Sequence, residues 1–206
     1  MKRTYFITGI GTDVGKTVAS AIVTQALEAD YWKPIQAGEL DSSDRLRVQS
    51  LIDNCNSKSY PETYCLNHPI SPHAAAERDG IEIDINSFEM PKTENHLVIE
   101  GAGGLLVPIN KKNTILDLIA KLKCEVILVS RHYLGSINHT LMSIEILKQR
   151  KIPIKGILFN GNENKDTEFI IKEMTGIQAL GRIDELEVLN KSVINSISER
   201  LKSALI

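Results

Sequence analysis

The chain has 206 residues, of which 42% are hydrophobic and 24% charged, an ordinary balance for one globular domain. A net charge of −2 excludes the broad basic field of a nucleic-acid-binding protein. The three cysteines lack metal-ligand or CxxC spacing, and an odd number fits a disulfide framework poorly, so we expect reduced thiols. The first residues do not resemble a signal peptide, and no apolar run is long enough to cross a bilayer. We therefore expect a cytoplasmic protein.

Short runs typical of buried strands alternate along the chain with longer amphipathic stretches. The strands that we expect lie at 5–8, 31–35, 97–100, 126–130, 156–160 and 179–183. The expected helices lie at 16–29, 44–53, 115–123, 136–150, 167–175 and 191–204. This alternation predicts an α/β fold, with right-handed βαβ units, a mostly parallel central sheet and helices on both faces.

Residues 54–94 are less regular than the rest and hold four of the seven prolines. We expect an irregular insertion at about 54–94, folded over the carboxyl edge of the sheet, within a single domain that spans 1–206. Ligands of open parallel sheets bind beyond the carboxyl ends of the strands. The residues that follow the expected strands are therefore the candidates for a functional site.

The segment from Gly9 to Thr17, GIGTDVGKT, follows the first expected strand and opens the first expected helix, which is the context of a P-loop. Its glycines let backbone N–H groups point at phosphate oxygens, and the helix N-terminus adds partial positive charge. Lys16 would reach the terminal phosphates, and the Thr17 hydroxyl suits Mg²⁺. The strict pattern has glycine at position 10, where this chain has Ile10, so the loop is one residue longer counted from Gly9. The alternative is a glycine-rich turn without a ligand.

Three charged residues lie where this crevice is expected. Glu100 ends the expected strand at 97–100 and precedes four small residues, which resembles a Walker-B acid that holds Mg²⁺. Lys33 lies near the end of the expected strand at 31–35, where it would stabilise a second anion near the γ-phosphate. Asp44 begins an expected helix, and by itself it indicates only a helix cap. For Glu100 and Lys33 the alternative is an ordinary solvated charge.

Together these motifs resemble the dethiobiotin synthetase family over nearly the whole chain. In chain order they are Thr12 with VGKT at 14–17, KPIQAG at 33–38, the Ser43–Asp44 pair, SPH at 71–73, EGAGG at 100–104, LGSINH at 134–139 and Asn160. The resemblance implies a single-domain P-loop NTPase fold and a cyclo-ligase of biotin biosynthesis. Such an enzyme converts 7,8-diaminopelargonic acid, CO2 and ATP into dethiobiotin, ADP and phosphate. The resemblance also implies Mg²⁺ as a cofactor and a homodimer with the substrate site at its interface, without nucleic-acid or membrane partners.

The resemblance also assigns roles to individual residues. The implied catalytic residues are Lys33, Lys16 and Thr12, and the implied magnesium ligands are Thr17, Asp44 and Glu100. The implied nucleotide contacts are Asp13, Val14, Gly15, Lys16, Thr17, Val18, Asp44, Glu100, Gly101, Ala102, Gly103, Asn160, Gly161, Asp184, Glu185 and Leu186. The implied substrate contacts are Lys33, Ala37, Gly135, Ser136, Ile137 and Asn138. For the last four residues, a plain helix cap at Ser136 is the alternative.

The sequence departs from the family pattern at two positions. Ala37 replaces a serine or threonine that faces the substrate, so that contact passes to a backbone N–H or water, or is lost. Asp184 replaces a proline beside the base, which makes the preference for ATP over other nucleotides an open question. We interpret His73 and His139 as structural.

Two other functions remain to be weighed on the same fold. A switch ATPase of the partition or septum-site type would bind macromolecular partners, but its signature lysine, five residues before the P-loop lysine, is Gly11 here. An amidotransferase ligase of the cobyrinic-acid type would need a glutaminase domain, for which 206 residues leave no room. The sequence therefore favours the dethiobiotin synthetase hypothesis.

Overall fold

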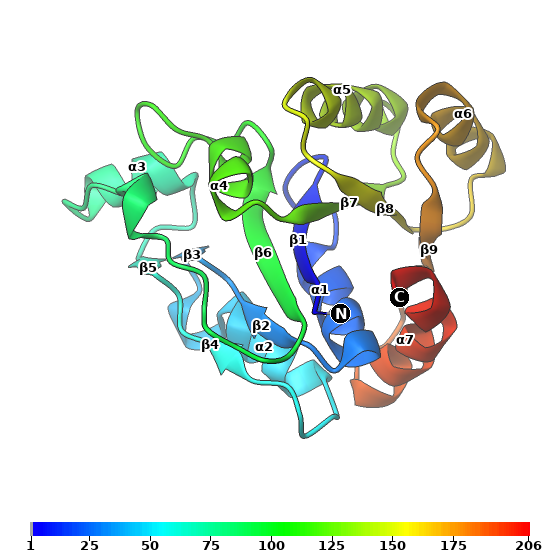
Figure 1. Cartoon of the computed structure of the whole chain (residues 1–206), viewed down its shortest axis with the longest axis horizontal. Helices are drawn as coiled ribbons and strands as arrows, with labels where there is room; N and C mark the ends of the chain where they lie inside the picture. Colours follow the sequence, from blue (N-terminus) through cyan, green and yellow to red (C-terminus); the bar gives the residue numbers. More distant parts are fainter. Residues whose placement is uncertain (1) are drawn as a thin grey trace.

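The structure, a computed structural model, describes residues 2–206, and its centre is one twisted parallel sheet (Figure 1). Every hydrogen-bonded strand pair in this seven-stranded sheet is parallel. In spatial order the strands are β4 (Ser59–Tyr60), β2 (Asp30–Trp32), β6 (Leu97–Gly104), β1 (Thr4–Gly9), β7 (Glu125–Arg131), β8 (Ile154–Asn160) and β9 (Ala179–Ile183). The strand order reverses around β1, which places the loop after β1 at the point where ligands bind in such sheets.

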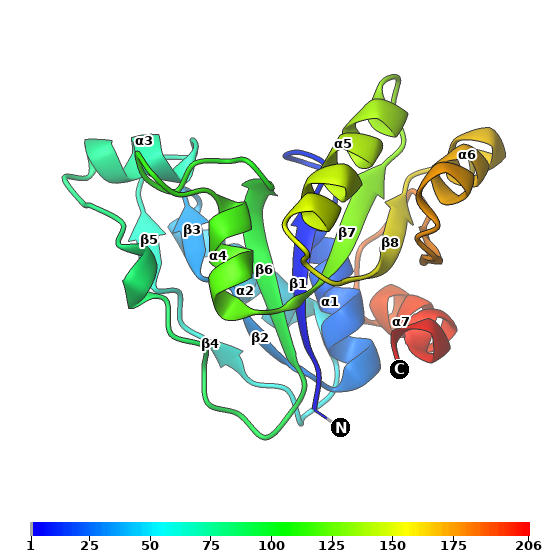
Figure 2. The same cartoon turned by 45° about the horizontal axis from the view of Figure 1, so that its top comes forward.

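Helices cover both faces of this sheet (Figures 1 and 2). One face carries α1 (Lys16–Leu27), α2 (Asp44–Leu51) and α7 (Lys191–Leu205), and the other carries α4 (Ile115–Leu122), α5 (Ser136–Gln149) and α6 (Lys165–Thr175). Side-chain oxygens of Ser43, Asn164 and Asn190 accept backbone N–H bonds at the starts of α2, α6 and α7, which fixes where these helices begin. Within residues 2–206, no helix is long and apolar enough to span a membrane. The α/β fold class expected from the sequence is confirmed.

The prediction of one continuous strand at 31–35 is wrong, because this stretch forms parts of two strands that belong to different sheets. β2 ends at Trp32, and β3 (Ile35–Ala37) pairs with β5 (Tyr64–Leu66) in a separate two-stranded sheet. The break falls at Pro34, which has no N–H to donate to a ladder. The Pro34 carbonyl instead accepts bonds from the backbone N–H groups of Thr63 and Tyr64. Lys33 therefore lies between the two sheets.

Two further expectations need correction. The strand expected to end at Glu100 continues to Gly104, and Glu100 pairs with Ile7 of β1 inside the sheet. The segment at 54–94 contains regular structure: α3 (Pro72–Arg78) contacts β3 and β5, and a 3₁₀ turn, η2 (Ile85–Ser87), follows it. Another 3₁₀ turn, η1 (Leu40–Ser42), lies just before the segment. Within the segment, β4 extends the main sheet and β5 completes the second sheet. β4 and β5 have only two and three residues, too few to give a clear alternating pattern in the sequence.

Replacing Ile22 by alanine is expected to lower the free energy of unfolding by about 2–5 kcal/mol. The Ile22 side chain is fully buried in the core that α1 and α7 share, so its loss leaves a cavity. Equilibrium denaturation in urea measures the change. Ile170→Ala on α6 is the matched control, because Ile170 is exposed and should contribute much less. Equal losses for the two variants would contradict this view of the core.

Candidate active site

The loop between β1 and α1 has the backbone conformation that a P-loop needs. Gly15 adopts the left-handed conformation (φ 93°), and a Cβ there would lie 2.4 Å from the Asn160 side-chain nitrogen. The Lys16 ammonium folds back over the loop and donates to the Gly11 carbonyl at 3.0 Å. The Ile10 N–H donates to Val129 of β7 at 3.1 Å, and its side chain packs against the core. The extra residue therefore anchors the loop to the sheet and leaves the phosphate-facing part intact.

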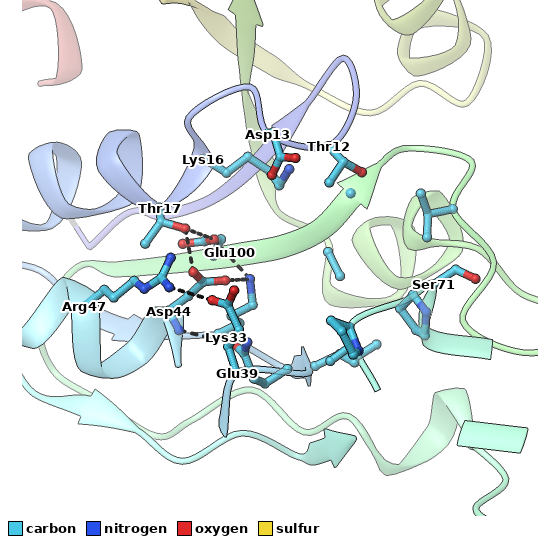
Figure 3. Close-up of a pocket in the computed structure, with 18 of the residues that line it drawn as sticks. Thr12, Asp13, Lys16, Thr17, Lys33, Glu39, Asp44, Arg47, Ser71 and Glu100 are labelled. Carbon is cyan, nitrogen blue, oxygen red and sulfur yellow. Dashed lines mark hydrogen bonds and ion pairs between the residues drawn. The ribbon is translucent and has the colours of Figure 1, made fainter. Parts of the chain in front are cut away.

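Four polar side chains converge beside this loop (Figure 3). The Thr17 hydroxyl oxygen lies 2.9 Å from both Asp44 Oδ1 and Glu100 Oε1. The Lys33 ammonium lies 2.6 Å from Asp44 Oδ2 and 3.1 Å from Glu100 Oε1. Lys33 and Glu100 are almost fully buried, so this is a tightly packed cluster of opposite charges. Lys33 and the P-loop residues Lys16 and Thr17 line the same pocket.

Burial and charge act against each other on these groups. Burial lowers the pKa of Lys33, but the Glu100 and Asp44 carboxylates outweigh it and raise the pKa above its usual value. Burial likewise raises the pKa of Asp44, and Lys33 with Thr17 reverses this, so the net shift is downward. For Lys16 burial is the largest influence, and its pKa is lowered. Lys33 therefore keeps its positive charge, and Asp44 its negative charge, at neutral pH.

The oxygens of this cluster fit a magnesium ion. Thr17 has one hydroxyl hydrogen, and it cannot satisfy Asp44 and Glu100 at the same time. A cation in contact with all three oxygens would remove that shortfall, and Mg²⁺ prefers hydroxyl and carboxylate oxygens. Asp44 lies in the first turn of α2, and its side chain also contacts Thr17 and Lys33. It therefore does more than complement the helix N-terminus.

Sequence reasoning missed Tyr31, which supports Glu100 from behind. The fully buried Tyr31 hydroxyl donates to Glu100 Oε2 at 2.8 Å, so both oxygens of this carboxylate have partners. Burial, and then the Glu100 charge, raise the pKa of Tyr31 well above its usual value, which keeps the hydroxyl a donor. Tyr31 precedes Lys33 by two residues, a spacing that puts two side chains on one face of an extended chain. That spacing is the signal by which Tyr31 could have been found.

A pocket of about 770 Å³ is lined by Lys16, Thr17, Lys33, Asp44 and Glu100, whereas Tyr31 lies behind its wall. Of the expected site residues it contains Thr12, Asp13, Gly15, Lys16, Thr17, Val18, Lys33, Ala37, Asp44, Glu100, Ala102 and Gly103. It also contains residues that were not expected: Ile35, Gln36, Glu39, Arg47, Pro69, Ile70, Ser71, Pro72 and Val107. The nearby Val14 and Gly101 support the wall rather than lining it, since Val14 is buried and a Cβ on Gly101 would meet the Phe6 ring at 2.7 Å.

Asn160 lies outside this pocket, at the end of β8, and it contacts the P-loop from the other side. Its side-chain nitrogen donates to the Val14 carbonyl at 2.8 Å. One N–H and the carbonyl oxygen of the amide remain, which is the donor and acceptor pair that matches the N7 and N6 edge of adenine. The next residue, Gly161, donates its N–H to the Ile183 carbonyl at 2.9 Å, which ties this strand end to the segment with Asp184, Glu185 and Leu186.

The Asp184 side chain is held by arginines. Arg182 Nε donates to Asp184 Oδ1 at 2.8 Å, and Arg200 lies 3.7 Å from Oδ2. The hydrogen bond from Arg182 lowers the pKa of Asp184, so its charge is already compensated. The replacement of the family's proline therefore adds a surface ion pair.

Replacing Asp184 by asparagine is expected to change the KM for ATP by less than about fivefold, because exposed ion pairs contribute little free energy. Steady-state kinetics with ATP, and with GTP as a second nucleotide, measure this. A large shift in the ratio of kcat/KM between the two nucleotides would mean that the carboxylate itself reads the base.

The segment Gly135, Ser136, Ile137 and Asn138 lines a second, separate pocket at the start of α5. Gly135 precedes the helix in the left-handed conformation (φ 107°), and the Ser136 N–H donates to the Tyr133 carbonyl at 3.0 Å. The N–H groups of Ile137 and Asn138, in the first turn of α5, are the ones available to a ligand in that pocket. His139 hydrogen-bonds the Tyr133 hydroxyl at 2.7 Å and belongs to this region rather than to the first pocket. Within residues 2–206 these four residues and Lys33 do not share a pocket.

The parallel sheet, the loop from Gly9 to Thr17 and the charges around it define a P-loop nucleotide-binding domain. Residues 3–193 match the family described as AAA domain. The chain is 54% identical, over all of its length and 99% of the relative, to the ATP-dependent dethiobiotin synthetase BioD of Christiangramia forsetii. It is 48% identical, over 98% of its length and 97% of the relative, to the BioD of Cytophaga hutchinsonii. The chain therefore belongs to the ATP-dependent dethiobiotin synthetase family.

Solved structures of partition and septum-site ATPases share the fold. The septum site-determining protein MinD of Pyrococcus horikoshii, complexed with Mg-ADP, has a TM-score of 0.62 at 14% identity, over 100% of this chain and 94% of that one. The pNOB8 ParA structure, bound to nonspecific DNA, has a TM-score of 0.63 at 8% identity, over 100% of this chain and 97% of that one. At such identities the likeness concerns the fold alone.

Proposed function

We propose that the protein is a dethiobiotin synthetase, which uses ATP and CO2 to close the ureido ring of 7,8-diaminopelargonic acid. The observation that carries the proposal is the convergence of Lys16, Lys33, Thr17, Asp44 and Glu100 on one pocket, in a chain of this family. Two cations and an acid pair around a P-loop suit a reaction in which an anion attacks a γ-phosphate.

The reaction proceeds in three steps. One amine adds to CO2 and loses a proton, which gives a carbamate. A carbamate oxygen attacks the γ-phosphorus and ADP leaves, which gives a carbamic–phosphoric anhydride. The second amine then attacks the anhydride carbonyl, a ring closes and phosphate leaves.

Each step makes a demand that the pocket residues meet. Lys16 neutralises the transferring phosphoryl group, and Lys33 neutralises the carbamate that approaches it. Thr12 lies on the P-loop wall of the same pocket, where its hydroxyl can donate to the reacting oxygens. Thr17, Asp44 and Glu100 would hold Mg²⁺, which neutralises charge on the β- and γ-phosphates when bound. Asn160 reads the adenine edge with the amide groups that Val14 leaves free.

The working form proposed here is a homodimer. The region around the start of α5 carries exposed apolar side chains, of which Leu134 is fully exposed and Tyr133, Ile137 and Met142 are exposed in part. A second copy of the chain on this surface would bury these side chains. It would also place the N–H groups of Gly135, Ile137 and Asn138 over the first pocket of its neighbour, where they could take the substrate carboxylate. All three cysteines are unpaired, which suits the reducing cytoplasm.

The test is a product assay on the purified protein with diaminopelargonic acid, bicarbonate, Mg²⁺ and ATP. Dethiobiotin should be visible by mass spectrometry, and phosphate release should need the diamine and bicarbonate together. Phosphate release that needs neither, or that DNA or lipid stimulates, would favour a switch ATPase instead.

A further inference from the structure

One ion pair at the pocket is not used by the proposed chemistry. Glu39 and Arg47 both line the pocket that contains Lys16 and Lys33, and Arg47 Nη2 lies 2.5 Å from Glu39 Oε2 (Figure 3). Both side chains are about half exposed, so they lie at the rim, open to an incoming substrate. Only one Glu39 oxygen takes part in this pair, and among residues 2–206 no hydrogen bond is formed by the other. The rim therefore offers a carboxylate oxygen to a ligand that enters the pocket.

The backbone at Glu39 is held in an unusual conformation. Gly38 and Glu39 are both left-handed, with φ of 72° and 52°, and glutamate rarely adopts such angles. Gly38 packs so closely on Pro69 that a Cβ would lie 2.5 Å from the proline side chain. The Gly38 N–H donates to the Leu66 carbonyl at 2.8 Å, so the turn is fixed from two sides. Other left-handed residues of this chain, such as Glu28 and Lys123, end helices, whereas Glu39 lies at the rim of the pocket. Its position at the pocket is therefore what gives this strained conformation a functional interest.

The charges of the pocket indicate what this carboxylate can bind. Lys16 and Lys33 already face the phosphoryl group and the carbamate, whereas the substrate's second amine is basic and needs an acceptor. Asp44 and Glu100 are committed to Lys33 and Thr17. Of the two remaining carboxylates of this pocket, Asp13 lies on the P-loop, whereas Glu39 lies two residues after Ala37, where the family resemblance implies a substrate contact. Because Ala37 has no hydroxyl, the wall needs a polar group from elsewhere.

We propose that Glu39, held by Arg47, binds the second amino group of the diamine and orients it for ring closure. The inference rests on the proposed function and adds a specificity-determining residue to it. Arg47 acts as a positioning residue, since it fixes one Glu39 oxygen and leaves the other for the amine. A charge-assisted hydrogen bond of this kind corresponds to roughly a tenfold difference in affinity.

Glu39→Gln is expected to raise the KM for the diamine roughly tenfold while the KM for ATP is unchanged. Glu39→Gly should have the same kinetic effect with a melting temperature at or above that of the wild type, because glycine relieves the left-handed strain. The matched control is Glu28→Gln, since Glu28 is also a left-handed glutamate (φ 47°) but caps α1 away from the pocket. This control should leave the kinetics unchanged.

Binding of two single-amine analogues, 7-aminononanoic and 8-aminononanoic acid, shows whether Glu39 contacts one amino group directly or only shapes the pocket wall. Calorimetry with a non-hydrolysable ATP analogue should find one monoamine weakened by Glu39→Gln and the other unaffected. Equal losses for both monoamines would mean that Glu39 only shapes the wall, and no loss for either, with an unchanged diamine KM, would exclude contact. Each result overturns the inference. Absence of dethiobiotin with the wild-type protein would instead overturn the proposed function.

Discussion

Lys33→Gln is expected to reduce kcat roughly 100- to 1000-fold while the Kd for ATP changes by less than about threefold. Lys33 is buried between Asp44 and Glu100, and their charges keep it protonated. The Lys33 ammonium pairs with these two carboxylates, so its removal leaves Lys16 and the loop N–H groups for the nucleotide. Single-turnover phosphate release measures the chemistry, and equilibrium binding of a labelled nucleotide measures the affinity.

The same substitution also has a cost in stability that must be separated from catalysis. Without the ammonium, Asp44 and Glu100 face each other uncompensated, which typically costs about 3–5 kcal/mol when a buried pair is broken. A melting curve with and without Mg²⁺ checks that the variant is folded, since the metal would replace the missing charge. Lys191→Gln is the matched control, because the pair of Lys191 with Asp53, at 3.5 Å, is exposed. A loss of ATP affinity as large as the loss of turnover would mean that Lys33 serves the nucleotide.

Glu100→Gln is the second substitution with a large expected effect. Glutamine keeps the size of the side chain and an oxygen for the Tyr31 hydroxyl, but removes the charge that Thr17 and Lys33 face. We expect the Mg²⁺ concentration for half-maximal activity to rise at least roughly tenfold, with a fall in kcat of roughly 100-fold. Titration of activity with Mg²⁺ at saturating ATP, together with direct Mn²⁺ binding, measures both effects.

Two comparisons make the Glu100 result interpretable. Glu199→Gln on α7 removes a carboxylate whose pair with Lys202 is exposed, and it should leave the metal titration unchanged. Asp44→Asn should shift the same titration in the same direction, because Asp44 lies 2.9 Å from the same hydroxyl. An unchanged titration for Glu100→Gln would remove Glu100 from the metal site and leave it as the counterion of Lys33.

The parts of the fold that could be predicted are those with long, one-sided patterns. Strands buried on both faces, such as Val126–Val129 within β7, are continuous apolar runs, and the helices between them are long enough to show their period. β4 and β5 have two and three residues, so no period can be recognised in them. The split at Pro34 was readable in principle, because proline cannot continue an internal ladder.

The site residues also fall into those that local sequence predicts and those that only the tertiary structure brings together. Lys16 and Thr17 are fixed by their place between a strand and a helix, and this local geometry needs no tertiary knowledge. Glu39 and Arg47 come together only because a left-handed turn and the start of α2 bring them to one rim, and single-sequence reasoning has no rule for such a meeting. Ser71 and Pro72 reach the pocket through the fold of the 54–94 segment, which the sequence left without detail.

The interruption of the chain at Pro34 has a consequence for how the enzyme can diversify. The P-loop belongs to the seven-stranded sheet, whereas Ala37 and the turn that follows it belong to the small β3–β5 sheet. Substitutions at exposed positions of the small sheet can reshape the wall that we propose selects the substrate, while the strands under the nucleotide keep their register. The two sheets are thus separately hydrogen-bonded units that are joined through Lys33 and through a shared core, in which Ile35 and Leu66 pack with Phe6 and Ile99. The exposed positions of the small sheet, and not its buried ones, can therefore change without disturbing the strands under the nucleotide.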